Sequence, residues 1–492
     1  MLVRQSKSSY IRCSTKYGYI TNQLTRQDRV YNETGAFFLK QISRVATDVD
    51  EIVTSMIPTL EGVSFSELKE DFLDFIADLE KFRFVVTGLT EDELNEKDLE
   101  FDYANGSPVN LVRDFSQDTK EIVPDNTQDF FLERNQGIPM ISALQFELSS
   151  RCNERCIHCY IPNEKKNKGF DMPFEKVKEI LDEFASMGGL HVTLSGGEAF
   201  LHKDLMKICR YCREKDLKIT ILSNLISLKD EHIPVLTETN VALIQTSLYS
   251  MDENIHDKIT TVKGSYKKTR NAIEKLVAAN VPVQISCPLM KANKEGYREV
   301  LEYAQSLKIK AQTDYIMMAE ANFDTSNLAN RLSLEDTEKV IRDILEYDID
   351  YRENTLMKKP LSDEYQIDKQ RFSKQPLCGV GYDSCCITAN GDVFPCAGWQ
   401  NYVIGNVYHQ TLKEIWENSE KVKNLRKITQ ASFPKCLDCE AFDFCNRCLV
   451  RNYNESNGNM FTIPKHFCDI AFLNMRIVKE YEDKLLKEMY IS

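Results

Sequence analysis

Three closely spaced cysteines constrain this chain more than any other feature of its sequence. Cys152, Cys156 and Cys159 have the spacing C-x3-C-x2-C. Thiolates are soft ligands that suit iron–sulfur clusters, and three of them leave one iron of a four-iron cluster free to bind a small molecule. A ferredoxin or a structural zinc site would need a fourth ligand. The spacing therefore favours a reaction centre built on a [4Fe–4S] cluster over either alternative.

The size and charge of the chain set the context of this centre. With 492 residues, the chain is too long for one hydrophobic core, so we expect about two to four domains. We find no signal-peptide core and no stretch apolar enough to span a bilayer. We therefore expect a cytoplasmic protein, in which 16 cysteines favour metal or redox chemistry over disulfides. A net charge of −13 disfavours a nucleic-acid or membrane partner.

The middle of the chain alternates predicted strands with amphipathic helices. The first helix starts at Pro173 and ends at Gly188-Gly189. Such alternation is typical of an α/β fold in which the loops after parallel strands build the active site. Short apolar segments predict strands at Leu144–Leu148, His191–Ser195, Lys218–Leu222, Val241–Leu248, Val281–Cys287 and Lys310–Ile316.

The second of these strands ends in Gly196-Gly197-Glu198. Glycines let backbone groups approach a ligand closely, and a neighbouring carboxylate could hold an ammonium group. Alone, this tripeptide more often marks an ordinary turn. Its position one strand–helix unit after the cysteine loop makes it a candidate binding site.

These two motifs together resemble those of the radical SAM superfamily. The resemblance implies a partial (β/α)6 TIM-like barrel over residues 141–330, with a [4Fe–4S] cluster on Cys152, Cys156 and Cys159. S-adenosylmethionine would bind the open iron and yield a 5′-deoxyadenosyl radical, so the cofactor does the hard chemistry. The residues that this resemblance assigns to S-adenosylmethionine are His158, Gly196, Gly197, Glu198, Asn224 and Ser247.

A second group of cysteines lies in the C-terminal region. It begins with Cys378, Gly391 and Cys396 in a C-x12-G-x4-C pattern and continues with C-x2-C-x5-C-x2-C and a last cysteine. One zinc ion is an alternative, although five residues between the pairs is short for common zinc modules. The full set resembles the SPASM extension of radical SAM enzymes and implies two auxiliary [4Fe–4S] clusters within residues 376–492.

By that resemblance, Cys378, Cys396 and Cys448 would bind the nearer auxiliary cluster, which Cys385 or Cys386 could close. Cys436, Cys439, Cys445 and Cys468 would bind the outer one. The family usually has three residues between its last two clustered cysteines, whereas Asn446 and Arg447 make two here. Cys209 and Cys212 also form a C-x2-C pair, but inside a predicted helix they are expected to be buried thiols.

Residues 1–90 are predicted to form a small winged-helix-like α+β domain. Strands are expected at Tyr10–Ser14, Tyr17–Leu24 and Arg29–Asn32, followed by three helices, two of them with capping patterns at Asp48 and Ser64. The last helix has an apolar stripe of Phe65, Leu68, Phe72, Phe75, Ile76 and Leu79. This order resembles a RiPP recognition element, which binds the leader of a ribosomally made peptide as an added strand. A DNA-reading winged helix is the alternative.

Two connecting regions complete the domain plan. Residues 91–140 are rich in acids and are interpreted as a linker that tethers a bound leader near the barrel, or as a plain solvated loop. Residues 331–375 are interpreted as a bridging region, with a helix at Leu332–Asp348.

The domain order points to a peptide-modifying oxidoreductase similar to sactipeptide or ranthipeptide synthases. We expect it to form cysteine thioether cross-links in a ribosomal precursor peptide, with flavodoxin or ferredoxin as reductant. Carbon–carbon cross-linking or decarboxylation would use the same parts. An anaerobic sulfatase-maturating enzyme is less favoured, because that family has an aspartate where Ala397 follows Cys396. A non-catalytic iron–sulfur electron-transfer protein is the remaining alternative. The sequence identifies no catalytic base.

Overall fold

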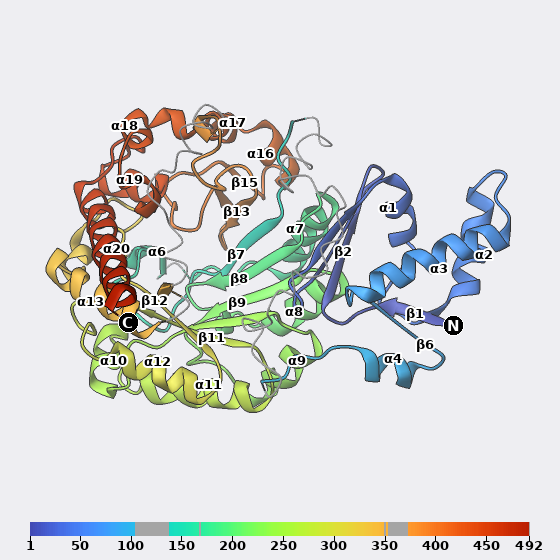
Figure 1. Cartoon of the computed structure of the whole chain (residues 1–492), viewed down its shortest axis with the longest axis horizontal. Coiled ribbons are helices and arrows are strands. Elements are labelled where there is room, and N and C mark those ends of the chain that lie inside the picture. Colours follow the sequence, from blue (N-terminus) through green and yellow to red (C-terminus); the bar gives the residue numbers. More distant parts are fainter. Residues whose placement is uncertain (104–136, 167–168, 349–350, 353–371, 492) are drawn as a thin grey trace.

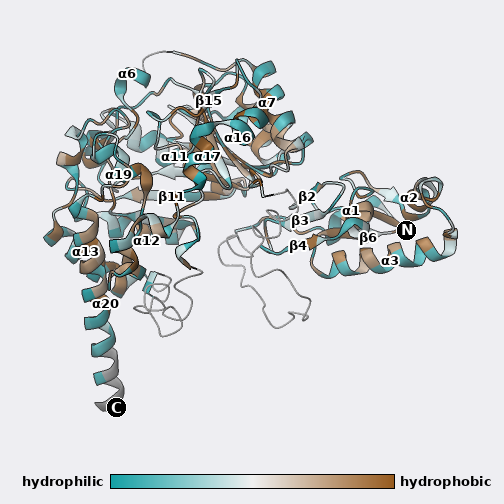
Figure 2. Cartoon of the chain, turned by 90° about the horizontal axis from the view of Figure 1, so that it is seen from above, coloured by the Kyte–Doolittle hydropathy of each residue, from teal (hydrophilic) through white to brown (hydrophobic). Residues whose placement is uncertain are grey.

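The computed structural model describes residues 1–103, 137–166, 169–348, 351–352 and 372–491. Figure 1 shows a small N-terminal domain at one end of the molecule, a central sheet flanked by helices, and a C-terminal part on the other side. Figure 2 shows the same separation from above, with the last helix extending away from the body. Within the described residues, no helix combines the length and the apolar character that crossing a membrane requires.

Nine strands form the central sheet in the order β12-β11-β10-β9-β8-β7-β13-β14-β15. Its first six strands are parallel and confirm the predicted partial barrel: β7 (Ala143–Ser149), β8 (His191–Gly196), β9 (Lys218–Ser223), β10 (Leu243–Ser247), β11 (Val283–Pro288) and β12 (Lys310–Asp314). β13 (Ser384–Ile387) pairs in parallel with β7, so the C-terminal region extends the barrel sheet. β14 (Asp392–Phe394) and β15 (Gly405–Asn406) add antiparallel strands.

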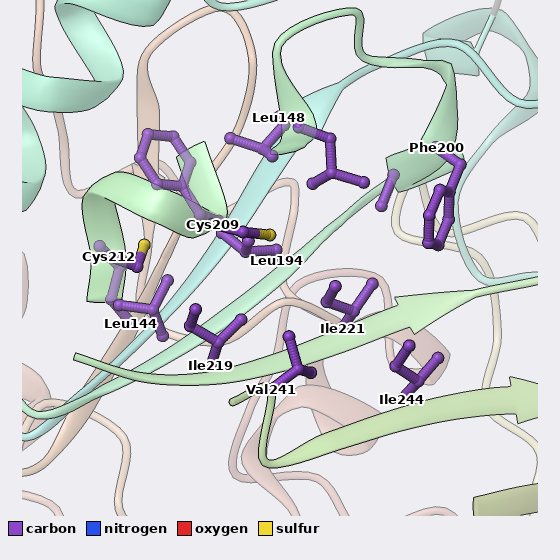
Figure 3. Packing of buried hydrophobic residues seen from close by; sticks show 14 of the residues in the cluster. Leu144, Leu148, Leu194, Phe200, Cys209, Cys212, Ile219, Ile221, Val241 and Ile244 are labelled. Carbon is purple, nitrogen blue, oxygen red and sulfur yellow. The ribbon is translucent and has the colours of Figure 1, made fainter. Parts of the chain in front are cut away.

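Alternation along the strands separates the core from the inside of the barrel. Leu144, Phe146 and Leu148 of β7 are buried in the main core, whereas Gln145 and Glu147 point to the other face. Figure 3 shows Leu144, Leu194 and Ile219 from neighbouring strands packed together. The covering helices are α7 (Phe174–Ser186), α8 (Leu205–Glu214), α9 (Ile233–Glu238), α10 (Glu253–Thr260), α11 (Ser265–Ala278) and α12 (Tyr297–Ser306), and α6 (Asn163–Lys166) follows the cysteine loop.

Two sequence predictions about these helices are confirmed. α7 follows Pro173 and buries Val177, Ile180, Leu181 and Phe184. Cys209 and Cys212 on α8 are fully buried in the same core, facing the sheet in Figure 3. They are therefore core residues.

The N-terminal domain contains more sheet than the sequence predicts. The expected strands form one sheet of β2 (Ser9–Cys13), β3 (Gly18–Asn22) and β4 (Asp28–Tyr31). A second, unpredicted sheet is made of β1 (Leu2–Gln5), β5 (Thr47–Asp48) and β6 (Val85–Gly88). The helices are α1 (Glu33–Leu39), α2 (Val49–Met56) and α3 (Phe65–Lys81).

Helix α3 confirms the predicted start but corrects part of the predicted stripe. Ser64 and Glu67 form a full capping box. Leu68, Phe72, Ile76 and Leu79 are buried, and each contributes about 1.5–3 kcal/mol by leaving water. Phe65, however, is exposed, because it is the first residue of the helix and lies beyond the core.

The predicted acidic linker begins with a helix that packs on the N-terminal domain. α4 (Glu91–Lys97) buries Leu94, and the buried Asp98 after it pairs with Arg4 over 2.6 Å. Residues 104–136 of the linker lie outside the described part. The predicted bridging helix is present as α13 (Leu334–Tyr347), and residues 353–371 of that region also lie outside it.

The N-terminal domain docks on the barrel through a polar cluster around Asp216. This carboxylate, in the loop before β9, accepts hydrogen bonds from the Ile11 N–H over 2.7 Å and from the side chains of Gln5 and Arg44. Arg12 donates to the carbonyls of Gly189 and Asp216. These barrel residues precede strands, so the domain sits at the N-terminal ends of the barrel strands.

The C-terminal part is mainly helical. It contains α16 (Leu412–Asn418), α17 (Glu420–Arg426), α18 (Pro434–Leu437), the short 3-10 helix η7 (Phe442–Phe444), α19 (Leu449–Glu455) and α20 (Lys465–Ile491). The buried side chain of Trp416 on α16 donates from its indole nitrogen to the Pro139 carbonyl, which ties this part to the segment before β7.

Candidate active site

The loop that carries the first three cysteines follows β7 and is held against the end of β8. The Gly197 N–H donates to the Ser149 carbonyl, and the Glu198 N–H donates to the Arg151 carbonyl, each over 2.8 Å. Three half-buried free thiols lie in this loop, those of Cys152, Cys156 and Cys159. β7 and β8 therefore bring the two sequence motifs together at one end of the barrel.

The glycine pair is required by this close backbone approach. A Cβ atom at Gly197 would lie well inside van der Waals contact of the Arg151 carbonyl, and one at Gly196 would meet the Ser149 carbonyl in the same way. Gly196 also has φ +147°, which side chains disfavour. The glycines therefore let β8 pass directly against the cysteine loop.

Glu198 is buried and firmly positioned. Its carboxylate accepts hydrogen bonds from the Ser223 hydroxyl over 2.6 Å, from the Asn224 N–H over 2.8 Å and from the Phe200 N–H over 3.0 Å. Burial raises its pKa, and these hydrogen bonds act in the opposite direction. The carboxylate therefore links β8 to the end of β9, where Asn224 lies.

Glu154 is a site residue that the sequence reasoning missed. It lies between two cysteines of the loop and is 4% exposed. The Cys156 thiol donates to its Oε2 over 3.3 Å, whereas Oε1 is buried with no hydrogen-bond partner among the described residues. Burial, together with the charge of Glu198, raises the pKa of Glu154 to about 7. The two buried carboxylates of Glu154 and Glu198 thus lie close together at the rim, the end of the barrel that carries the cysteine loop.

The other predicted contacts surround the same rim. The His158 ring packs edge-on against Tyr249 with 5.1 Å between centroids, and its Nδ1 is buried with no partner in the described residues. Asn224 donates from its side chain to Asn153 in the cysteine loop over 2.6 Å. Ser247 ends β10 and lies beside Tyr249. All the predicted residues therefore gather near the cysteine loop.

The C-terminal cysteines separate into two groups. Cys378 lies close enough to Cys448 and Cys396 to interact with them electrostatically. Burial, together with these neighbouring thiols, raises the pKa of Cys378 to about 11. Cys436 interacts with Cys439 and Cys468, and Cys445 interacts with Cys436 and Cys468. These groups have the same members as the two sets that the sequence resemblance implies. Among the described residues, no three His, Cys, Asp or Glu side chains converge as ligands of a single metal ion.

The structure distinguishes Cys385 from Cys386 on β13. Cys385 packs in the main apolar core, and burial alone raises its pKa to about 12. Cys386, on the opposite face of the strand, interacts electrostatically with Cys396. The geometry therefore favours Cys386 over Cys385 as the residue that could close the nearer cluster.

Tyr160 and Glu147 lie between the first cysteine loop and the nearer C-terminal group. Tyr160 interacts electrostatically with Glu147, Cys159 and Cys396. Glu147 is 6% exposed and accepts a hydrogen bond from the Gln400 side chain over 2.7 Å. Burial raises the pKa of Glu147 to about 7. Neither residue belongs to a recognisable motif, but the alternation of β7 is a signal that puts Glu147 on the inner face.

These residues fit the cofactors that the sequence resemblance implies. Three separate groups of thiols supply the soft ligands that iron–sulfur clusters need. The paired carboxylates of Glu154 and Glu198, one with an unpartnered oxygen, fit a cationic group such as the amine of S-adenosylmethionine.

Comparison with known families defines the class of the protein. Residues 146–307 match the family model for the radical SAM superfamily, and residues 378–440 match SPASM, described as an iron–sulfur cluster-binding domain. The chain therefore contains a radical SAM domain and a SPASM domain, and the cofactors of these domains are S-adenosylmethionine and [4Fe–4S] clusters.

The individual relatives are named for different biosynthetic roles. An AdoMet-dependent heme synthase of Methanosarcina barkeri is 26% identical over 63% of this chain and 91% of its own length. The antilisterial bacteriocin subtilosin biosynthesis protein AlbA of Bacillus subtilis is 25% identical over 65% of this chain and 69% of its own. The structure of Streptococcus suis SuiB bound to precursor peptide SuiA covers 92% of this chain and 96% of SuiB, with 17% identity and a TM-score of 0.60. The last likeness concerns the fold.

Proposed function

We propose that this enzyme modifies a ribosomally made precursor peptide, and that its most favoured product is a cysteine thioether cross-link. The N-terminal domain would bind the leader of that peptide, and the barrel would hold the part to be modified. A flavodoxin or ferredoxin would supply the electrons.

The observation that carries this proposal is the N-terminal domain docked on the barrel. Residues 91–492 are 402 of the 492 residues, so a fold match over 92% of the chain must include part of the first 90. The matched protein, SuiB, is described in complex with its precursor peptide. The heme synthase match covers only 63% of the chain. The added domain therefore supports a peptide as substrate.

Within the N-terminal domain, β4 offers the expected place for a leader. Among the described residues, it is one of the two edge strands of its sheet. The Gln27 carbonyl accepts a bond from the Asn22 N–H of β3, so by alternation the N–H and C=O groups of Val30 point to the open side. An extended leader could pair there as an added strand. This assignment keeps residues 1–90 as a recognition element.

In the barrel, each proposed residue has a defined task. Cys152, Cys156 and Cys159 would hold the first cluster, and Glu198 with Gly196 and Gly197 would hold the methionyl part of S-adenosylmethionine. His158, Asn224 and Ser247 would contact its nucleoside. When bound, these cofactors supply a 5′-deoxyadenosyl radical, which removes a hydrogen atom from the substrate.

The C-terminal thiols would hold two auxiliary clusters, with Cys378, Cys396 and Cys448 on the nearer one. The outer set would be Cys436, Cys439, Cys445 and Cys468. Thioether formation needs an acceptor for one electron when the substrate sulfur joins a carbon radical and the thiol proton leaves. A cluster held by the nearer set of thiols would supply that acceptor. Carbon–carbon coupling would need the same acceptor when its own bond forms, and decarboxylation would need it as carbon dioxide leaves.

A reaction on a tetrapyrrole is the second candidate. It is favoured by the heme synthase, which aligns over 91% of its own length. Sulfatase maturation is less favoured because Ala397 follows Cys396, and the intact cysteine loop with Glu198 argues against a non-catalytic protein.

The test is anaerobic incubation of the cluster-loaded enzyme with S-adenosylmethionine, reductant and the short peptide encoded beside its gene. Parallel reactions contain an iron porphyrin in place of the peptide. We expect the peptide to lose two hydrogens and one alkylatable thiol. The same loss with every thiol still reactive would indicate a carbon–carbon bond. An unchanged peptide together with a changed porphyrin would reject the proposal.

A further inference from the structure

An opening that bears on the substrate lies beside β12, the last strand of the barrel. A cavity of about 580 Å³ runs along residues 310–316 and is closed on the far side by the C-terminal part, including Cys445, Arg451 and Asn474. This volume is within the range of about 300–1,000 Å³ that is typical of ligand sites. The cavity therefore separates the edge of the barrel from the loop with the outer cysteines.

One edge of β12 carries backbone groups without a partner strand in the described residues. In the described part of the chain, β12 is terminal in the sheet and pairs only with β11. The Asp314 carbonyl accepts the Leu289 N–H on the β11 side. By alternation, the N–H and C=O groups of Ala311 and Thr313 point away from β11 and into the opening. Such a row of groups is a template for an added strand.

The side chains on the inner face make this opening continuous with the inside of the barrel. Gln284 of β11 donates to Gln312 of β12 over 3.2 Å, and both line the cavity. The core-facing residues Val283, Ile285 and Cys287 lie on the other face of the sheet. A chain beside β12 would therefore lie along the barrel interior, outside the apolar core.

β12 also runs between the two ends of the barrel at which the leader-binding domain and the cysteine loop lie. The N-terminal domain contacts loops that precede β8 and β9, whereas the cysteine loop follows β7. These contacts mark opposite ends of the parallel strands. A five-residue strand spans about 16 Å between those ends, so a peptide alongside β12 can pass from the leader-binding end to the radical-forming end.

We propose that the segment of the precursor peptide that follows the leader binds in this cavity as an extended strand, paired with the open edge of β12. The inference rests on the proposed function and adds the route by which the substrate enters. Recognition of this peptide segment would be largely independent of the segment's sequence, because the hydrogen bonds join backbone groups.

Hydrogen exchange tests the pairing directly. The cluster-loaded enzyme with S-adenosylmethionine and no reductant is measured with and without the peptide encoded beside the gene. We expect slower exchange of the Ala311 and Thr313 amides when the peptide is present. Amides that are already slow before peptide is added would show that the edge is paired by the chain itself, which would overturn the inference.

Backbone changes give a second, independent test. Thr313→Pro removes one open-edge N–H but no bond to β11, and is compared with Thr313→Ala, which keeps the N–H. We expect the peptide's KM to be about two- to tenfold higher for the proline variant, the effect of one hydrogen bond. In a series of peptides, each N-methylated at one successive position, the KM should be higher for every second peptide, since alternate residues face β12.

The outcomes separate the two proposals. If the wild-type enzyme modifies the peptide but neither exchange nor N-methylation shows the expected pattern, only the β12 site is rejected. If the wild-type enzyme does not modify the peptide, the proposed function itself fails.

Discussion

At the residue scale, the contact between β8 and the cysteine loop depends on the absence of a side chain at position 197. We predict that Gly197→Ala lowers stability by about 1–3 kcal/mol, the usual cost of overpacking, and reduces the iron bound after reconstitution. Thermal unfolding and iron analysis measure the two effects.

Gly296→Ala is the matched control for this substitution. The nearest atom to a Cβ there is the Ser250 hydroxyl at 3.7 Å, which is ordinary contact. Its melting temperature should stay near that of the wild type. Equal losses in the two variants would show that the tight approach at Gly197 has no special importance.

Glu198 supplies the second residue-scale prediction. Glu198→Gln keeps the size of the side chain but removes its negative charge. A hydrogen bond to a charged group contributes about 1.5–3 kcal/mol, so the Kd for S-adenosylmethionine should rise by about 10- to 100-fold. Equilibrium dialysis on enzyme with full iron content measures this change, and an unaltered Kd would remove Glu198 from the proposed site.

The sequence predicts some residues of the site but not others. The cysteines and Gly-Gly-Glu could be predicted because their spacing reflects the chemistry of their ligands. Glu154 and Tyr249 could not, since each has partners from segments distant in the chain, and the sequence signal for Glu147 is limited to the alternation of β7. Tyr249, for example, meets His158 only when β10 and the cysteine loop come together.

At the scale of elements, the docking of the N-terminal domain depends on Asp216. Asp216→Asn retains a residue that tolerates the left-handed backbone there, with φ of 55°, but leaves Arg12 and Arg44 without their carboxylate. We predict that the docking of the N-terminal domain is weakened by about 2–3 kcal/mol, because charged hydrogen bonds are lost. Hydrogen exchange in β2 should then become faster.

A surface ion pair provides the control for that variant. Arg210 and Glu238 are more than half exposed, and exposed pairs contribute little because water and salt screen them. Glu238→Gln should therefore leave exchange in β2 unchanged. If Asp216→Asn behaved in the same way, the polar cluster would not hold the domain.

The proposed leader edge gives a further prediction at this scale. Val30→Pro removes an N–H from the open side of β4, where proline is tolerated. It should weaken binding of a fluorescent leader peptide by about two- to tenfold, the effect of one hydrogen bond. Val30→Ala keeps the N–H and is the comparison; equal binding by both variants would argue against strand addition at β4.

The elements also show where sequence prediction succeeds. The six barrel strands are short apolar runs with clear turns, so local pattern is sufficient. The sequence does not predict β1 and β6, because β1 pairs with residues 80 to 86 positions away and no local periodicity indicates such pairing. The sequence of α4 favours a linker, because it has many acidic residues and one buried leucine, Leu94.

At the scale of the whole molecule, three parts are arranged around one sheet. The N-terminal domain lies at one end of the barrel strands, the cysteine loop at the other, and β13 joins the C-terminal part to β7. The sequence predicts the order of these parts but not this arrangement, because the contacts around Asp216 and the cavity beside β12 join distant segments.

The most direct test of the central claim is transfer of deuterium from peptide to cofactor. The peptide encoded beside the gene, deuterated at its carbon positions after the leader, is incubated with the reconstituted enzyme, S-adenosylmethionine and reductant. We predict 5′-deoxyadenosine heavier by one deuterium, together with loss of that deuterium from the modified peptide. Formation of only unlabelled 5′-deoxyadenosine, with the peptide unchanged, would contradict the claim that a peptide is the substrate.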